Sequence, residues 1–244
     1  MSQSIRTQIS NSESAAPHWK ALYRAGGVAA LVQLGCVLIT LIVATTLGVE
    51  PTTPSEYFTG LGQDRLVTLL RLDFPSLIHV ALFAVTSCAV FAALQENKRM
   101  YAGLGVGLVF TGVVLVLAKH SAFSMIHLAD QYAAATTEAQ RTLLLAAGEA
   151  VIASDWWHST GGFFAGLFLQ GGTVLISCIM LRSEHFSKAT AWTGILANGL
   201  DWIHVLIQLV SPGLAAIVLA IGGLFYVAWY PLLARDFLRL GKHA

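Results

Sequence analysis

An acid, a tryptophan and a histidine occur twice in this order, as DWWH at 155–158 and as DWIH at 201–204. In each copy the carboxyl group and the imidazole are three residues apart, a spacing that places both side chains on one face of a helix. Carboxylates and imidazoles are the side chains that bind zinc and transfer protons. Both copies lie at the ends of apolar segments, so they are the first candidates for chemistry.

Two further histidines, His79 and His120, fall near the ends of two other apolar segments. An ionisable side chain at membrane depth costs a few kcal/mol, so it normally faces a partner or a water-filled cavity. We therefore expect one polar pocket, open to the outer side of a membrane. The expected lining comes from four helices and consists of His79, His120, Asp155, His158, Asp201 and His204. The half of the bundle nearest the cytoplasm is expected to be almost bare of ionisable residues.

Each candidate also has a structural explanation. Asp155 is placed to cap the helix that follows it, where free N–H groups and the helix dipole favour an acid. Asn198, Asp201, His204 and Gln208 form one polar stripe, which is also typical of an interhelical hydrogen-bond ladder. Lone histidines such as His79 and His120 are more often hydrogen-bonded within a bundle than bound to a metal. The sequence leaves both explanations open.

Three chemistries fit such a pocket. The first is a zinc site with His79, His120, His158 and His204 as ligands, and with Asp201 and Asp155 as general bases or orienting groups. At the depth of the lipid head groups, this site would hydrolyse a lipid-like substrate. The second is binding or transport of a small solute or proton, or a role as a subunit of a larger complex. The third is haem b held by paired histidines, with quinone as partner. The sequence does not decide whether the protein is an enzyme.

The elements that position these residues are predicted from composition. The chain has 244 residues, of which 56% are hydrophobic and 11% charged, and its mean hydropathy is +0.69. Soluble domains carry about 25% charged residues. We therefore expect an all-α, polytopic membrane protein surrounded by membrane lipid. Its net charge of +1 gives no indication of nucleic-acid binding. The expected six-helix bundle occupies residues 26–233, with spans at about 26–47, 74–95, 102–128, 156–181, 190–210 and 213–233.

The distribution of basic residues predicts the orientation of the bundle. Positive side chains accumulate on the cytoplasmic side of a membrane. If both termini are cytoplasmic, only four basic residues of the 14 lie outside: Arg65, Arg71, Lys119 and Arg141. A polar segment (1–25) and a basic tail (234–244) then lie inside, and a surface helix is expected within 129–155. This arrangement predicts a multi-pass membrane protein with both termini in the cytoplasm.

Aromatic and glycine residues complete the predicted bundle. Aromatic belts are expected at both interfaces, with Trp156 and Trp157 outside and with Trp192, Tyr226, Trp229 and Tyr230 near the cytoplasm. Two glycine pairs with four-residue spacing predict close helix packing in lipid: Gly103 with Gly107, and Gly162 with Gly166.

The C-terminal part of the chain resembles a known family. Residues 155–188 (DWWHSTGGFFAGLFLQGGTVLISCIMLRSEHFSK) form an acid-and-histidine start to a glycine-rich helix, followed by a short basic turn. The next segment, ATAWTGILANGLDW at 189–202, is rich in small residues and ends in an acid. In residues 155–240 this pattern resembles domain-of-unknown-function family 4386. The resemblance implies a six-helix bacterial inner-membrane protein and assigns no activity.

Overall fold

The protein is seen here as a computed structural model. It describes residues 2–48, 50–72, 74–155 and 158–243, with side chains at 2–18, 95–98 and 243 outside the description. The described residues form helices and no strands, which confirms the all-α fold. The helices are α1 (Ser2–Thr46), α2 (Pro54–Gln63), α3 (Arg65–Arg71), α4 (Phe74–Lys119), α5 (Ala122–Ala134), α6 (Glu138–Ala153), α7 (Thr160–Met180), α8 (Lys188–Ile207) and α9 (Pro212–His243).

Five helical segments are long and apolar enough to cross a membrane. They are Trp19–Thr46, Phe74–Leu94, Arg99–Ala134, Thr160–Met180 and Pro212–Lys242. These segments confirm a membrane protein and coincide with five of the six predicted spans. The predicted span at 190–210 corresponds to α8. This helix has 20 residues, but its sequence is less apolar than those of the other five segments. Its buried side includes the polar residues Thr190, Asn198 and His204, which explain its lower hydropathy.

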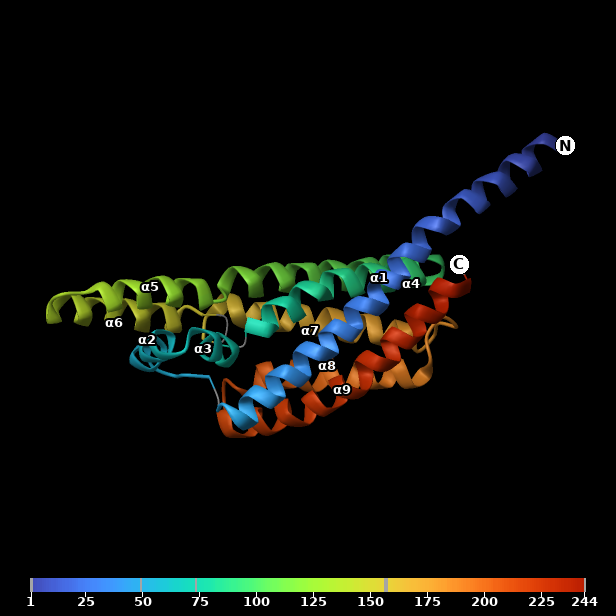
Figure 1. Cartoon of the computed structure of the whole chain (residues 1–244). Coiled ribbons are helices and arrows are strands. Elements are labelled where there is room, and N and C mark those ends of the chain that lie inside the picture. Colours follow the sequence, from blue (N-terminus) through green and yellow to red (C-terminus); the bar gives the residue numbers. More distant parts are fainter. Residues whose placement is uncertain (1, 49, 73, 156–157, 244) are drawn as a thin grey trace.

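The 46 residues of α4 form two antiparallel arms (Figure 1). A straight helix of this length would measure about 70 Å, more than twice the thickness of the hydrocarbon core. A Cβ atom placed on Gly103 would lie 3.8 Å from the ring of Phe91, which is impossible across twelve residues of one straight helix. The chain therefore reverses direction between Leu94 and Arg99, as the polar segment at 95–100 predicts.

The helices run lengthwise in one elongated bundle with a small cap at one end (Figure 1). We call α2, α3, α5 and α6 the cap, and the adjoining end of the bundle the cap end. The beginning of the span in α1 and the last turns of α9 meet at the opposite, terminal end, where Gly241 lies against Arg24 and Tyr23. Helix α7 packs against both α4 and α8, while α9 packs against α1 and α8.

Close helix packing involves one of the predicted glycines, Gly166, and several others. A Cβ atom on Gly172 of α7 would lie 2.6 Å from the carbonyl oxygen of Gly105, and one on Gly112 would lie 2.5 Å from the backbone of Leu169. A Cβ atom on Gly107 would meet no atom of another helix within 4 Å, so the predicted Gly103–Gly107 pair does not form a close helix contact. The physical reason is that residues 105 and 112 lie seven positions apart on one face of a helix. Gly166 does pack closely, against Val205 of α8.

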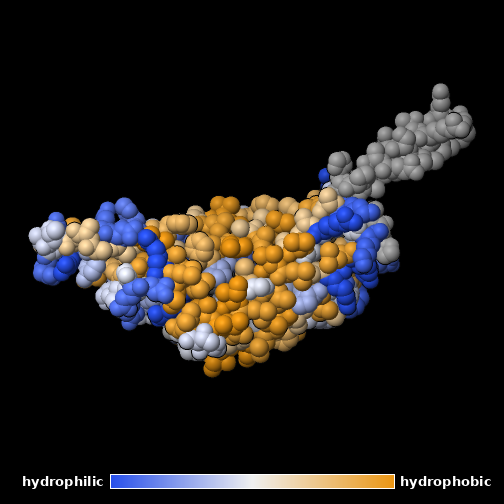
Figure 2. All heavy atoms as spheres, in the orientation of Figure 1, coloured by the Kyte–Doolittle hydropathy of each residue, from blue (hydrophilic) through white to orange (hydrophobic). Residues whose placement is uncertain are grey.

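The cap has a hydrophobic core of its own. Tyr57, Phe58, Leu61, Leu72 and Met125 are buried together, with side chains of α6 packed around them. Helix α6 fulfils the prediction of a helix within 129–155 and begins with a capping box at Thr137. A bidentate contact between Arg65 and Asp130 joins α3 to α5. On the face in view, Figure 2 shows an apolar band over the middle of the bundle and polar residues at both ends. The cap therefore projects beyond the apolar band as a small packed unit.

The predicted aromatic belt at the terminal end is wrong for three of its members. Tyr226, Trp229 and Tyr230 are buried inside the bundle, whereas Trp192 is exposed. The buried rings pack on one another, and Tyr226 and Tyr230 stack with centroids 5.7 Å apart. Their positions follow from α9, which continues to His243 through the segment predicted as a tail. Trp156 and Trp157 lie outside the described residues.

Candidate functional site

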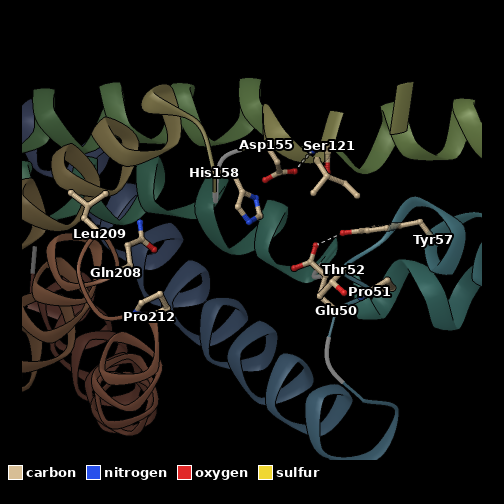
Figure 3. A pocket seen from close by; sticks show the side chains of 11 residues that line it. Glu50, Pro51, Thr52, Tyr57, Ser121, Asp155, His158, Gln208, Leu209 and Pro212 are labelled. Carbon is tan, nitrogen blue, oxygen red and sulfur yellow. Dashed lines mark hydrogen bonds between the residues drawn. The ribbon is translucent and has the colours of Figure 1, made fainter. Parts of the chain in front are cut away.

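A cavity of about 550 Å³ lies where the cap meets the bundle. Four parts of the chain line it: the segment entering α2, the break between α4 and α5, the end of α6 with residues before α7, and the turn between α8 and α9. In Figure 3 the His158 ring and the Glu50 carboxylate extend into the space between these segments. Apolar contacts come from Ile152 and Leu209. The full lining is Glu50, Pro51, Thr52, Tyr57, Ser121, Ile152, Asp155, His158, Gln208, Leu209 and Pro212; we call this space the cap cavity.

Glu50 and Tyr57 form one wall of the cap cavity. The Tyr57 hydroxyl donates a hydrogen bond of 2.8 Å to Glu50 Oε1. Helix α2 holds Tyr57 there, because Thr53 caps its first turn and the Tyr57 ring belongs to the cap core. Burial, and to a smaller extent the Glu50 carboxylate, raise the pKa of Tyr57 well above its usual range. The phenol therefore stays neutral and keeps the carboxylate oriented.

Asp155 does cap a helix, but not the one predicted. Its Oδ2 accepts a hydrogen bond of 3.0 Å from the backbone N–H of Ser121, where α4 ends and α5 begins. The start of α7 is capped instead by Ser159, whose hydroxyl accepts from Gly162. His120, the other candidate at this break, accepts from the backbone of Ala122 through Nδ1. Both residues therefore satisfy backbone groups that the helix break leaves free.

His158 is exposed and lines the cap cavity. The backbone carbonyl of Asp155 accepts from the N–H groups of His158 and Ser159. Helix α6 ends at Ala153 and α7 begins at Thr160, so neither Asp155 nor His158 belongs to a helix, and the shared helical face predicted for them is wrong. Both residues nevertheless line the same cavity.

Asp201 lies in a buried polar cluster between α7, α8 and α9, on the cap side of the bundle. Its Oδ2 accepts from the Gln170 amide and lies 3.1 Å from the Tyr226 hydroxyl. That hydroxyl is also 3.1 Å from Asn198 Oδ1 and 3.2 Å from Gln170 Oε1. On the other side, His204 Nδ1 lies 3.6 Å from Asp201 Oδ1. We call Gln170, Asn198, Asp201, His204 and Tyr226 the Asp201 cluster.

His79 reaches the edge of the Asp201 cluster from α4. Its Nε2 hydrogen-bonds to the hydroxyl of Tyr230, and its ring makes edge contacts with Phe83, Tyr226 and Tyr230. Aromatic rings thus contact the imidazole on several sides. The six candidates predicted for a single pocket lie in different places. Asp155 and His158 line the cap cavity, and His120 lies at the break between α4 and α5 without lining the cavity. His79, Asp201 and His204 lie deeper in the bundle.

The residues do not gather as a metal site. In the parts of the chain that the structure describes, no three His, Cys, Asp or Glu side chains are placed to hold one metal ion. A catalytic zinc needs three protein ligands. Zinc and haem b therefore remain predictions from sequence without support from the geometry.

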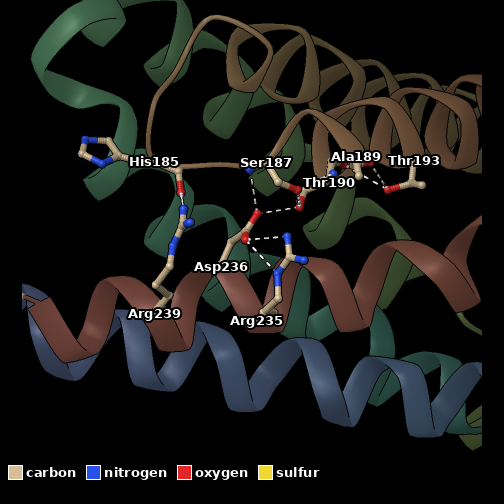
Figure 4. Close-up of polar contacts among 8 residues, drawn as sticks. All are labelled: His185, Ser187, Ala189, Thr190, Thr193, Arg235, Asp236 and Arg239. Atoms are coloured by element: carbon tan, nitrogen blue, oxygen red, sulfur yellow. Dashed lines mark hydrogen bonds and ion pairs between the residues drawn. The ribbon is translucent and has the colours of Figure 1, made fainter.

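A second buried aspartate lies at the terminal end, where ionisable groups were not expected. Asp236 of α9 is fully buried, and its Oδ2 accepts from the Ser187 N–H and the Thr190 hydroxyl at the start of α8 (Figure 4). Its Oδ1 accepts from the guanidinium of Arg235. We call these four residues the Asp236 cluster. The acid stabilises the N-terminus of α8 and joins it to α9.

Sequence reasoning missed several residues that complete these sites. Gln170 gave a signal, because an amide in the middle of an apolar helix needs a partner. Tyr226 and Tyr230 resembled interface residues, and only the packing of α9 reveals that they are buried. Glu50 and Tyr57 lie in a segment predicted as a plain connection, where no pattern marked them.

The comparisons with known proteins add no assignment. No protein family, no curated protein and no solved structure matches this chain. The resemblance to domain-of-unknown-function family 4386 therefore stays a prediction, and function has to be argued from the geometry.

Proposed function

We propose that this chain is a six-pass membrane protein that binds a small amine, or another cation with an apolar portion, in the cap cavity. The observation that supports this function is the cavity lining. It combines two carboxylates, Glu50 and Asp155, with an imidazole and apolar side chains, and no Lys or Arg is among the described residues that line it. Such a wall attracts a positive group and offers it hydrogen-bond acceptors. Binding or transport needs no metal, which suits the arrangement better than hydrolysis does.

The proposal includes the direction of the bundle. Helix α8 is the sixth pass, because it packs alongside α7 and α9 and, with 20 residues, is about 30 Å long. Basic residues concentrate at the terminal end, as at Lys20, Arg24, Arg239 and Lys242. By the positive-inside rule that end is cytoplasmic. The cap cavity then opens on the outer side and takes its ligand from there.

The test compares two ligands that differ in charge but share an apolar chain. Isothermal titration of the purified full-length protein with butylamine and with butyrate measures both affinities. We expect butylamine to bind more tightly, and Glu50→Gln to weaken its binding about tenfold, which corresponds to about 1.4 kcal/mol. The matched control is Glu149→Gln, because Glu149 is an exposed acid of α6 outside the lining. Tighter binding of butyrate would contradict the ligand class, and no binding of either would contradict the function.

A further inference from the structure

The Tyr226 hydroxyl lies among more hydrogen-bond acceptors than it has protons. It has one proton, yet three oxygens lie 3.1 to 3.2 Å from it: Gln170 Oε1, Asn198 Oδ1 and Asp201 Oδ2. One proton of each amide is used in another hydrogen bond, since Gln170 donates to Asp201 and Asn198 donates to the Gly194 carbonyl. A hydroxyl fully satisfies one acceptor, so two oxygen–oxygen contacts have no proton between them. Buried acceptors in this situation are costly.

We infer that the Asp201 cluster is a binding site for one proton. A proton from water forms an O–H bond on Asp201 Oδ2, and the carboxylate changes from charge −1 to neutral. The new O–H donates to the Tyr226 oxygen at the observed 3.1 Å separation, and the Tyr226 O–H then donates to Asn198 Oδ1. The added proton thus raises the number of these contacts that have a proton between them from one to two, and it removes a negative charge from the bundle. Release of the proton reverses both changes.

The groups around Asp201 match this role. The ionisable neighbours are His204 on α8, His79 on α4, and Tyr226 and Tyr230 on α9, while α7 contributes the neutral Gln170. Over the described part of the chain, the ion pair of Asp201 is to His204 alone. A fixed cation beside Asp201 would favour its ionised form, and Arg235 occupies such a position beside Asp236, 3.0 Å from its Oδ1. Asp201 has no such partner among the described Arg and Lys side chains.

A route for the proton runs along α8 from the cap cavity. Gln208 lines the cavity, and His204 and Asp201 follow at steps of four and three residues on the same helical face. The imidazole of His204 is 3.6 Å from Asp201, within reach of a small movement or a water bridge. Imidazole is the side chain best suited to pass a proton near neutral pH. The proton site stands without the proposed amine, because its geometry does not involve the ligand.

Infrared difference spectra between acidic and alkaline buffer test the inference on the full-length protein in lipid bilayers. The parent is expected to show the C=O band of a protonated carboxylic acid, equivalent to about one proton per molecule. Asp201→Asn loses this band, and Asp236→Asn, the matched control, keeps it. Tyr226→Phe retains the carboxyl group but removes its partner, so the band shifts in frequency.

Three results would overturn the inference. The first is a carboxylic acid band that persists in Asp201→Asn, and the second is a band that does not shift in Tyr226→Phe. The third is a change in the infrared bands of the cluster when sodium chloride, but not choline chloride, is added at constant pH. Such a change would identify the oxygens as ligands of a metal cation. Amine binding by the cap cavity is measured separately, so either proposal can fail alone.

Discussion

Two aspartates on neighbouring helices have opposite surroundings. Asp236 is fully buried and accepts hydrogen bonds from a backbone N–H, a hydroxyl and a guanidinium, so its carboxylate is compensated. Asp201 is partly buried; it receives an amide N–H and shares the single proton of Tyr226 with two other oxygens. The number of donors around each acid therefore distinguishes a structural acid from a functional one. The first arrangement stabilises the fold, and the second gains a hydrogen bond when a proton is added.

The largest expected effect is that of Asp236→Ala. Removing the carboxylate leaves the Ser187 N–H and the Thr190 hydroxyl buried without their acceptor. Each unsatisfied donor costs about 1–3 kcal/mol, so we expect a loss of about 3 kcal/mol in the free energy of unfolding. Unfolding in graded denaturant measures it. A variant as stable as the parent would show that this cluster does not stabilise the fold.

Gly172→Ala tests how far α7 holds the Asp201 cluster in place. The new Cβ meets the Gly105 carbonyl oxygen at 2.6 Å, so α7 and α4 must separate, at a cost of about 2 kcal/mol. Gln170 moves with α7, and the carboxylic acid band of Asp201 should shift. Gly107→Ala is the control, because it has open space around it and gains up to about 1 kcal/mol from helix propensity. Equal stability of the two variants would contradict the described packing.

Tyr226→Phe is expected to destabilise by about 1 kcal/mol, less than loss of the Asp236 carboxylate. The variant removes the one hydroxyl proton available to Asn198 Oδ1 and Gln170 Oε1. Packing stays the same, because the ring of Tyr226 remains stacked on Tyr230. Thermal unfolding beside Tyr101→Phe, an exposed tyrosine of α4, isolates the effect of burial. An equal loss of stability in both variants would show that the hydroxyl of Tyr226 makes no stabilising hydrogen bond.

The smallest effect concerns alkaline pH and the cap. Because the pKa of Tyr57 is raised in the folded state, the unfolded chain loses this proton first as pH rises. The contribution of the Tyr57 hydroxyl to the free energy of unfolding is fully present below about pH 10, the pKa of a free tyrosine, and it decreases above that pH. Tyr57→Phe should therefore lose less stability than the parent between neutral and strongly alkaline pH. An identical alkaline decrease in both proteins would contradict the burial of this hydroxyl.

Sequence predicted the parts of this fold that depend on hydropathy. Apolar length identified five spans, and the polar segment at 95–100 marked the reversal within α4. The stripe of Asn198, Asp201 and His204 was found because α8 is a regular helix with period 3.6. Which helices face one another is set by packing, so the partners Gln170 and Tyr226 could not be read from α8. The same reason explains why Asp155 and Asp201, alike in their motifs, lie in different sites.

The most direct test of the contrast between the two aspartates is thermal unfolding of Asp201→Asn and Asp236→Asn, measured side by side at neutral pH. Asparagine carries no charge. When the Gln170 amide turns over, its oxygen accepts from the new N–H and its own N–H donates to the Tyr226 oxygen, so we expect Asp201→Asn to unfold at or above the temperature of the parent. In Asp236→Asn the charge that pairs with Arg235 is lost, so unfolding should occur at least several degrees lower. The reverse order would contradict the assignment of Asp236 as structural and of Asp201 as the proton site.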